Sequence, residues 1–293
     1  MVDHKSPQNR NMGREFLEDR AKFIRTETVR LTRIAGAGHY SSTFSCAELL
    51  AALYYAHLRF NPAKPQWEDR DRFVLSKGHA AIGLYPVLAD LGFFDAAELE
   101  TYTRFGSRFG DHPDMKKVPG IDFSSGSLGH GLSIGLGMAL GARVQGRSFR
   151  TFIMLGDGEL CEGQVWEAAM AASHYELQNL VAIVDRNQLC IDGFCDDIMA
   201  VEPLEDRFRS FGWETTRIDG HDLDAVLAAL DALPPAGSGR PQAIIADTIK
   251  GRGVKRMELS LDWHVGNLVG DDYDDVLAEL EAGLQPFEEE VAQ

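Results

Sequence analysis

The sequence predicts a three-layer α/β fold, in which a mostly parallel central sheet is covered by helices on both faces. Nearly continuous apolar runs at residues 149–155, 180–185 and 242–248 are typical of strands that are buried on both sides. Helical patterns separate these runs, which is the alternation that builds a parallel sheet. The chain has 293 residues, of which 44% are hydrophobic, so it can bury the core of one large domain.

The elements of the first half follow from local patterns. Residues 14–35 carry apolar side chains at helical intervals, and Ser45 and Glu48 form a capping box that predicts the start of a second helix. A short strand at 72–76 leads into a loop and helix over 77–92. The helix predicted at 127–146 carries glycines at positions 129, 131, 135, 137 and 141, and each glycine in a helix interior costs about 1 kcal/mol against alanine. We therefore expect another backbone to approach it closely, within a helix pair or at a subunit contact.

The second half predicts helices over 163–178 and 222–233, with a weaker strand at 213–218. From residue 271 the sequence becomes an acidic helix and tail. We divide the chain into an N-terminal extension (1–13), one α/β domain (14–270) and the acidic C-terminal helix and tail (271–293).

Charge and composition exclude several classes of function. The chain has 45 acidic and 29 basic residues, a formal net charge of −16 that disfavours nonspecific binding of nucleic acid. No apolar run reaches the roughly 20 residues of a membrane helix. The four cysteines fit neither a disulfide scaffold nor a zinc pattern, so we expect free thiols and a cytoplasmic protein. An anionic ligand would need a metal, a cation or a helix N-terminus.

One motif suggests such a ligand. The strand at 149–155 ends at Gly156-Asp157-Gly158, and the next strand ends before Asn187. Because parallel strands bring their carboxyl ends to one sheet edge, these side chains should lie close together. A carboxylate and an amide oxygen suit Mg²⁺ or Ca²⁺, and the glycines let phosphates approach backbone N–H groups. The tripeptide alone would indicate only a turn.

The whole pattern of strand, GDG, helix, strand and Asn is the motif of thiamine diphosphate enzymes. The run "GDGELCEGQVWEAAMAASHYELQNLVAIVDRNQLCIDG" resembles the transketolase family, and the similarity extends over residues 14–270. Further segments that carry it are "GAGHYSSTFS", "RFVLSKGHA", "FGSRFGDHPD", "SSGSLGHGLSIGLGMA" and "DTIKGRGVKRMELSLDWH". The resemblance implies the thiamine diphosphate-binding fold, with thiamine diphosphate and Mg²⁺ as cofactors and Ca²⁺ or Mn²⁺ as alternative metals.

The resemblance also implies which residues hold the cofactor. Gly126 would offer its carbonyl oxygen to the aminopyrimidine, and Leu128 would pack on the rings. Gly156 and the Gly158 N–H would lie at the diphosphate. The implied metal ligands are the side chains of Asp157 and Asn187 and the carbonyl oxygen of Leu189.

Four histidines in matching segments are the candidate catalytic residues. By the resemblance, His79 and His264 would lie beside the diphosphate, and His39 and His264 would exchange protons with sugar hydroxyls. His112 would bind the hydroxyl and carbonyl end of the donor. Proton transfer near neutral pH suits imidazole. His130 stands where many transketolases carry glutamine, and we interpret it as structural.

Single-chain members of the family are more than twice as long and include a pyrimidine-binding domain, whose glutamate activates the cofactor. We find no such domain here, so we expect the N-terminal subunit of a split transketolase that transfers a two-carbon ketol unit between sugars or sugar phosphates. A separate C-terminal subunit would complete an α2β2 enzyme, with helix 127–146 as the candidate contact surface.

Two alternatives remain open. The α subunit of a 2-oxoacid dehydrogenase shares the GDG…N motif and also pairs with a second chain. A non-catalytic thiamine diphosphate-binding protein is the other. The sequence does not identify the sugars.

Overall fold

The computed structural model describes residues 13–287 and contains one parallel five-stranded sheet. The strand order is β1-β2-β3-β5-β4, and every neighbouring pair is parallel. The predicted α/β fold is therefore confirmed, including the weak strand, which becomes the edge strand β4. The strands are β1 (Arg72–Leu75), β2 (Thr151–Gly156), β3 (Leu180–Arg186), β4 (Glu214–Asp219) and β5 (Gln242–Asp247).

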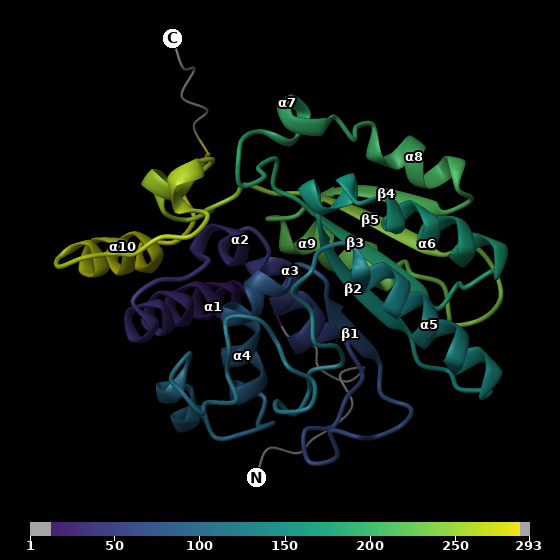
Figure 1. Cartoon of the computed structure of the whole chain (residues 1–293), viewed down its shortest axis with the longest axis horizontal. Coiled ribbons are helices and arrows are strands. Elements are labelled where there is room, and N and C mark those ends of the chain that lie inside the picture. Colours follow the sequence, from purple (N-terminus) through teal and green to yellow (C-terminus); the bar gives the residue numbers. More distant parts are fainter. Residues whose placement is uncertain (1–12, 288–293) are drawn as a thin grey trace.

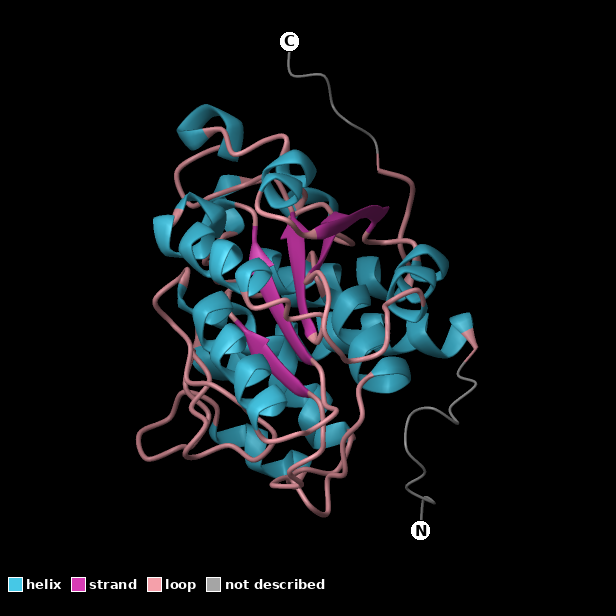
Figure 2. Ribbon diagram, turned by 90° about the vertical axis from the view of Figure 1, so that its right-hand side faces the viewer, coloured by secondary structure: helices cyan, strands magenta, loops and turns pink. Residues whose placement is uncertain are grey.

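Helices lie on both sides of the strands (Figure 2). Along β2 the side chains alternate between two cores: Phe152 and Met154 pack with the helices of one face, Ile153 and Leu155 with those of the other. This double burial explains the continuous apolar runs. The α-helices are α1 (Arg14–Ala35), α2 (Tyr40–Phe44), α3 (Ala47–Ala51), α4 (Ala81–Asp90), α5 (His130–Val144), α6 (Gly163–His174), α7 (Cys195–Met199), α8 (Leu204–Ser210), α9 (Leu223–Asp231) and α10 (Asp272–Glu281).

Shorter helical turns complete the chain. A π-helical turn, Ala52–His57, continues α3, and the 3₁₀ turns are Gly78–Ala80, Ala96–Thr101, Gly158–Cys161, Lys255–Met257 and Leu261–Trp263. Two of these, Gly78–Ala80 and Gly158–Cys161, follow β1 and β2 directly. No helix within residues 13–287 is long and apolar enough to cross a membrane.

The predicted capping box at Ser45 and Glu48 does not form. Helix α3 begins after Cys46 without a side-chain cap. The Ser45 hydroxyl instead donates to Asp185 Oδ2 (2.6 Å), and Glu48 pairs with Arg25 of α1 (N–O distance 2.6 Å). Ser45 and Glu48 thus both make charge-assisted contacts with distant segments, and such contacts are stronger than the neutral hydrogen bonds of a local helix cap.

The acidic C-terminal helix belongs to the same folded body. In Figure 1 α10 lies beside α1, and its apolar side packs into a third core cluster. Val276 and Leu280 of α10 contact this cluster, which also contains Val29 and Phe44. The domain boundary at 270/271 stays a prediction, and residues 1–12 of the predicted extension lie outside the described residues.

The glycines of α5 serve two different environments. A Cβ atom at Gly135 would lie 2.1 Å from Ile153 Cδ1, so the helix can approach β2 only without a side chain there. Gly137 has nothing within 4 Å of the equivalent position. Gly135 therefore lets α5 approach a side chain of its own sheet, and the subunit contact expected from the sequence stays a prediction.

These two glycines give a matched stability test. We expect Gly135→Ala to lower the free energy of unfolding by about 1–3 kcal/mol through overpacking. Gly137→Ala should raise it by up to about 1 kcal/mol, because alanine favours the helix and meets no neighbour. Urea unfolding of both variants measures the difference, and equal effects would contradict the packing of α5 on β2.

Candidate functional site

The carboxyl ends of four neighbouring strands bring polar residues to one edge of the sheet. β1 is followed by Lys77 and His79, and β2 by Asp157. β3 is followed by Asn187, and β5 by Lys250. Neighbouring parallel strands bring their carboxyl ends to one edge, so Asp157 and Asn187 lie together as the sequence predicts, whereas Lys77 and Lys250 were not predicted there.

The four predicted catalytic histidines converge. The centroid of the His39 ring lies 5.3 Å from that of His79, 5.4 Å from that of His264 and 6.3 Å from that of His112. The rings of His79 and His264 are 5.5 Å apart. His264 Nδ1 is buried and has no hydrogen-bond partner among residues 13–287. An unpaired buried nitrogen in a histidine cluster fits a site that a ligand completes.

Backbone contacts hold the segments that carry two of these histidines. Gly38 and Gly266 exchange both backbone hydrogen bonds (3.0 Å each), which ties the residue before His39 to the loop after His264. The Ser41 hydroxyl adds a bond to the Trp263 carbonyl oxygen (2.8 Å). Segments from opposite ends of the chain therefore form one wall of the site.

The predicted cofactor-binding residues Gly126, Leu128 and Gly158 have different surroundings. A Cβ atom at Gly126 would lie 3.6 Å from His112 Cδ2, so Gly126 is adjacent to the histidine cluster. Leu128 is half-buried on the following loop, and its carbonyl oxygen accepts a bond from Gln164 (3.3 Å). At Gly158 a Cβ would meet Cys190 Sγ at 2.6 Å, so only glycine fits there.

The predicted metal ligands occupy one loop edge. The backbone N–H groups of Gln188 and Gly158 donate to the Asp157 carboxylate (2.7 and 2.9 Å), so Asp157 lies against the loop that starts at Asn187. The Asn187 side-chain oxygen accepts from Leu189 N–H (3.3 Å). Both side chains are buried, each 4% exposed. The carboxylate, amide and carbonyl oxygens of this set are hard ligands of the kind that Mg²⁺ takes.

A lysine already contacts the third ligand. Lys250 Nζ donates to the carbonyl oxygen of Leu189 (2.8 Å), so this oxygen carries a positive partner in the structure. Within residues 13–287 no group of three or more His, Cys, Asp or Glu side chains could hold a metal. The predicted set contains one carboxylate only, so a bound ion would complete its coordination with diphosphate and water oxygens.

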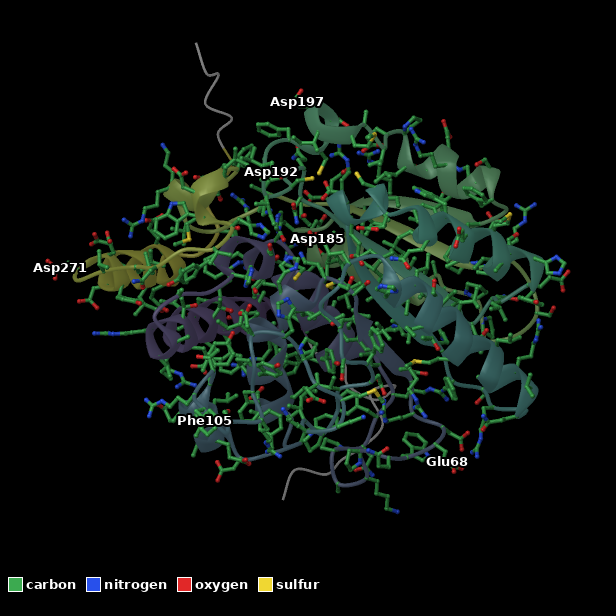
Figure 3. All side chains as sticks on the ribbon, in the orientation of Figure 1. Glu68, Phe105, Asp185, Asp192, Asp197 and Asp271 are labelled. Carbon is green, nitrogen blue, oxygen red and sulfur yellow. The ribbon has the colours of Figure 1, made fainter. Side chains whose placement is uncertain are left out.

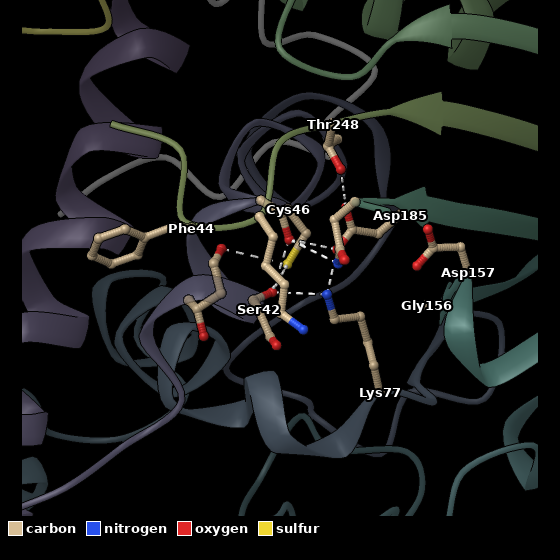
Figure 4. A network of polar contacts seen from close by, with 12 residues as sticks. Ser42, Phe44, Cys46, Lys77, Gly156, Asp157, Asp185 and Thr248 are labelled. Carbon is tan, nitrogen blue, oxygen red and sulfur yellow. Dashed lines mark hydrogen bonds and ion pairs between the residues drawn. The ribbon is translucent and has the colours of Figure 1, made fainter. Parts of the chain in front are cut away.

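A buried ion pair lies next to the predicted metal ligand Asn187, and our sequence interpretation missed it. Lys77, 1% exposed, pairs with the fully buried Asp185 and also donates to the Ser42 carbonyl oxygen (2.8 Å) (Figure 4). Asn187 Nδ2 donates to the same Asp185 carboxylate (3.1 Å). Figure 3 labels Asp185 near the middle of the view, and this side chain is fully buried. The pair thus orients Asn187.

Charge and burial set the protonation of the site. Burial raises the pKa of Asp157, and the negative charge of Asp185 raises it further. Burial would also raise the pKa of Asp185, but the Lys77 ammonium outweighs it and holds that pKa below its usual value. A cation at Asp157 would therefore relieve an unfavourable negative charge.

Two of the histidines are held neutral. Burial lowers the pKa of His79 well below its usual value, and the Lys77 ammonium lowers it further. Burial, followed by the charge of Lys250, lowers the pKa of His264 to about 3. At neutral pH each ring is therefore uncharged, with one nitrogen that can donate an N–H hydrogen bond and one whose lone pair can accept a hydrogen bond. Burial lowers the pKa of Lys250 itself to about 8.

Glu159 is a second residue that sequence reasoning missed. It is 3% exposed, and its carboxylate accepts bonds from the backbone N–H groups of Gly129 (2.8 Å) and Gly156 (3.0 Å) and from the Ser76 hydroxyl. It thereby connects the ends of β1 and β2 to the start of α5. Its position inside "GDGELCEG" was the available signal. His130 lies exposed at the first position of α5.

Comparisons with known proteins show the family to which the chain belongs. Residues 18–290 match the family described as "Transketolase, thiamine diphosphate binding domain". The chain is 38% identical to an apulose-4-phosphate transketolase subunit of Phocaeicola vulgatus, covering 94% of this chain and 98% of that protein. It is 40% identical to the 6-deoxy-6-sulfo-D-fructose transketolase subunit SqwG of a Clostridium species, covering 90% of this chain and 96% of that protein.

The chain also superposes on solved structures of transketolases. The transketolase of Campylobacter jejuni superposes with a TM-score of 0.85 at 29% identity, covering 93% of this chain and 43% of that chain. The transketolase of Leishmania mexicana gives a TM-score of 0.83 at 27% identity over 90% of this chain and 41% of that one.

Proposed function

Because this chain belongs to the transketolase family, we propose that it is the diphosphate-binding subunit of a two-chain, thiamine diphosphate- and Mg²⁺-dependent transketolase. The observation that carries the proposal is the meeting of four histidines with Asp157 and Asn187 at one sheet edge. Full-length similarity to proteins named as single subunits supports the division of the enzyme into two chains.

Each group of residues has a defined task in this proposal. Asp157, Asn187 and the Leu189 carbonyl oxygen hold the metal, and Lys250 lies beside this set, where its ammonium can face the diphosphate. When bound, thiamine diphosphate supplies the carbanion and the electron sink for cleavage of the C–C bond. His39 and His264 move protons on the sugar hydroxyls, and His112, whose side chain is 42% exposed, binds the donor.

The relatives indicate the class of substrate. Their names specify apulose 4-phosphate and 6-deoxy-6-sulfofructose, ketoses that carry an anionic group. We propose that the donor here is likewise a ketose with a phosphate or sulfonate group. The acceptor is an aldose or aldose phosphate.

The partner is a pyrimidine-binding subunit, and the assembly is α2β2. Its candidate contact surface is the outer side of α5, where Gly137 and Gly141 border a groove of about 520 Å³. Met115, Ile134 and Met138 also line this groove, and apolar surface of this kind is typical of protein contacts. The four free cysteines support a cytoplasmic location.

The test is to reconstitute the pair and identify its reaction. We expect the chain, mixed with a pyrimidine-binding subunit encoded next to it, to transfer two carbons from a phosphorylated or sulfonated ketose to an aldose. Product formation must require the aldose, thiamine diphosphate and Mg²⁺. Oxidative decarboxylation of a 2-oxoacid would instead assign the pair to the dehydrogenases. Failure to bind thiamine diphosphate even in the pair would favour a non-catalytic protein.

A further inference from the structure

Asp111 is a carboxylate at the histidine cluster to which the proposed function gives no task. Its Oδ1 lies 3.4 Å from Nδ1 of His39, and its Oδ2 lies 3.7 Å from Nδ1 of His112. Catalytic hydrogen bonds are often long in the ligand-free state and tighten when substrate binds. Asp111 therefore contacts two of the four histidines on their Nδ1 sides.

The surrounding structure fixes the position of this carboxylate. The hydroxyl of Tyr85, a fully buried residue, donates to the carbonyl oxygens of Gly110 and His112 (3.0 Å each). This bond pair holds the backbone on both sides of Asp111. The hydroxyl of Tyr102, also fully buried, donates to Asp111 Oδ1 (3.3 Å). Two buried phenols thus aim an acidic side chain, itself 41% exposed, at the rim of the cluster.

The charge of Asp111 is also coupled to the histidines. Burial would raise the pKa of Asp111, but the hydrogen bond and charge of His39 lower it, followed by the charge of His112 and the Tyr102 hydrogen bond. The net pKa lies below the usual value, so the group is an anion at neutral pH. An ionised carboxylate only accepts hydrogen bonds, so the nitrogen that faces it must carry the hydrogen.

We propose that Asp111 is a positioning residue that holds His39 as the Nδ1–H tautomer and directs its Nε2 lone pair toward the substrate. The catalytic part of this inference rests on the proposed function. Nε2 then accepts the proton of a substrate hydroxyl, and the positive charge that forms on the ring faces the Asp111 carboxylate. The same proton returns from Nε2 in the reverse direction. The hydrogen bond of one ring nitrogen sets the tautomer of the other.

The test is the Asp111→Asn variant. The asparagine amide can donate a hydrogen bond to Nδ1 of His39, so this variant no longer requires His39 to carry its hydrogen on Nδ1. The first readout is the nitrogen NMR spectrum of the full chain labelled in histidine, with the His39 signals assigned through His39→Gln. We expect His39 to be mainly Nδ1–H in the wild type and to lose this preference in Asp111→Asn. Asp274→Asn, an exposed change of the same type on α10, is the matched control and should leave the spectrum unaltered.

The second readout is steady-state kinetics of the reconstituted pair. We expect Asp111→Asn to lower kcat by about 10- to 100-fold, a part of the contribution of general acid–base catalysis. The KM for the donor should change much less, and Asp111→Glu should recover part of the rate. A rise in the KM for the donor with an unchanged kcat would show that Asp111 only binds the donor and would overturn the proposal.

The two readouts separate the inference from the proposed function. His39 protonated mainly on Nε2 in the wild type, or a tautomer ratio in Asp111→Asn equal to that in Asp274→Asn, would overturn the role of Asp111 even if the pair transfers ketol units. A tautomer that depends on Asp111 in a pair without ketol transfer would instead refute the proposed function and retain the contact.

Discussion

Asp157→Ala should lower the affinity for thiamine diphosphate in the presence of Mg²⁺ by at least about 100-fold. Loss of an outer-shell partner alone typically costs 10–100-fold in metal affinity, and Asp157 is proposed as a direct ligand. It is also the one carboxylate in the proposed set. Isothermal titration of the reconstituted pair measures the affinity, and removal of divalent ions from the wild type should produce a similar loss.

Two controls separate ligand loss from misfolding. The Asp157 carboxylate accepts two backbone N–H bonds, so its loss can disturb the 187–189 loop. Asp157→Asn keeps an oxygen for one of these bonds and removes the charge. We therefore expect this variant to keep the thermal stability of the wild type, whereas its affinity for thiamine diphosphate should no longer depend on Mg²⁺. Asp274→Asn should behave as the wild type. An unchanged affinity in folded Asp157→Ala would contradict the assignment of Asp157 as a ligand.

The second large effect concerns the chain on its own. We expect the purified chain to give no ketol transfer above background at any concentration of cofactor, and to become active when the pyrimidine-binding subunit is added. By its resemblance to transketolases, the glutamate that activates the cofactor comes from the pyrimidine-binding side. The structure contains the proposed groups of the diphosphate side, including His39, Asp157 and Lys250, and we propose that the second subunit supplies that glutamate.

Titration of the second subunit provides the measurement. Activity should rise linearly until the two chains are equimolar and then reach a plateau, as a fixed stoichiometry requires. Adding an Asp157→Ala chain in place of the wild type should give no activity at the same ratio. Full turnover by the lone chain would contradict the two-chain proposal while leaving the reaction class intact.

Local patterns were sufficient for the sheet and for the edge that carries the site. The continuous apolar runs, the glycines around Asp157 and the spacing to Asn187 are local properties, because each can be read from a short stretch of the chain. The acidic helix after residue 271 was also predicted correctly as a helix. Its packing against α1 was not, since net charge obscured the apolar stripe of Val276 and Leu280.

The prediction failed where distant charges compete with local signals. Ser45 and Glu48 match a capping box, yet they bond Asp185 and Arg25 because ionic partners became available only in the folded chain. For the same reason Lys77 could not be distinguished from an ordinary loop residue, and the signal for Glu159 was only its position inside "GDGELCEG". Their roles depend on burial, and burial is a property of the assembled layers.

The sequence by itself determined the α/β alternation and the strand ends that meet at the candidate site, and its resemblance to transketolases indicated the candidate histidines. Only the tertiary structure decided that the rings of His39 and His264 lie 5.4 Å apart, that Lys77 neutralises Asp185 and that Asp111 faces His39. The physical reason is that helix and strand patterns depend on residues that are close together in the sequence. A pKa or the position of a proton depends instead on which charges from remote segments come within a few ångströms, in a medium of low dielectric constant.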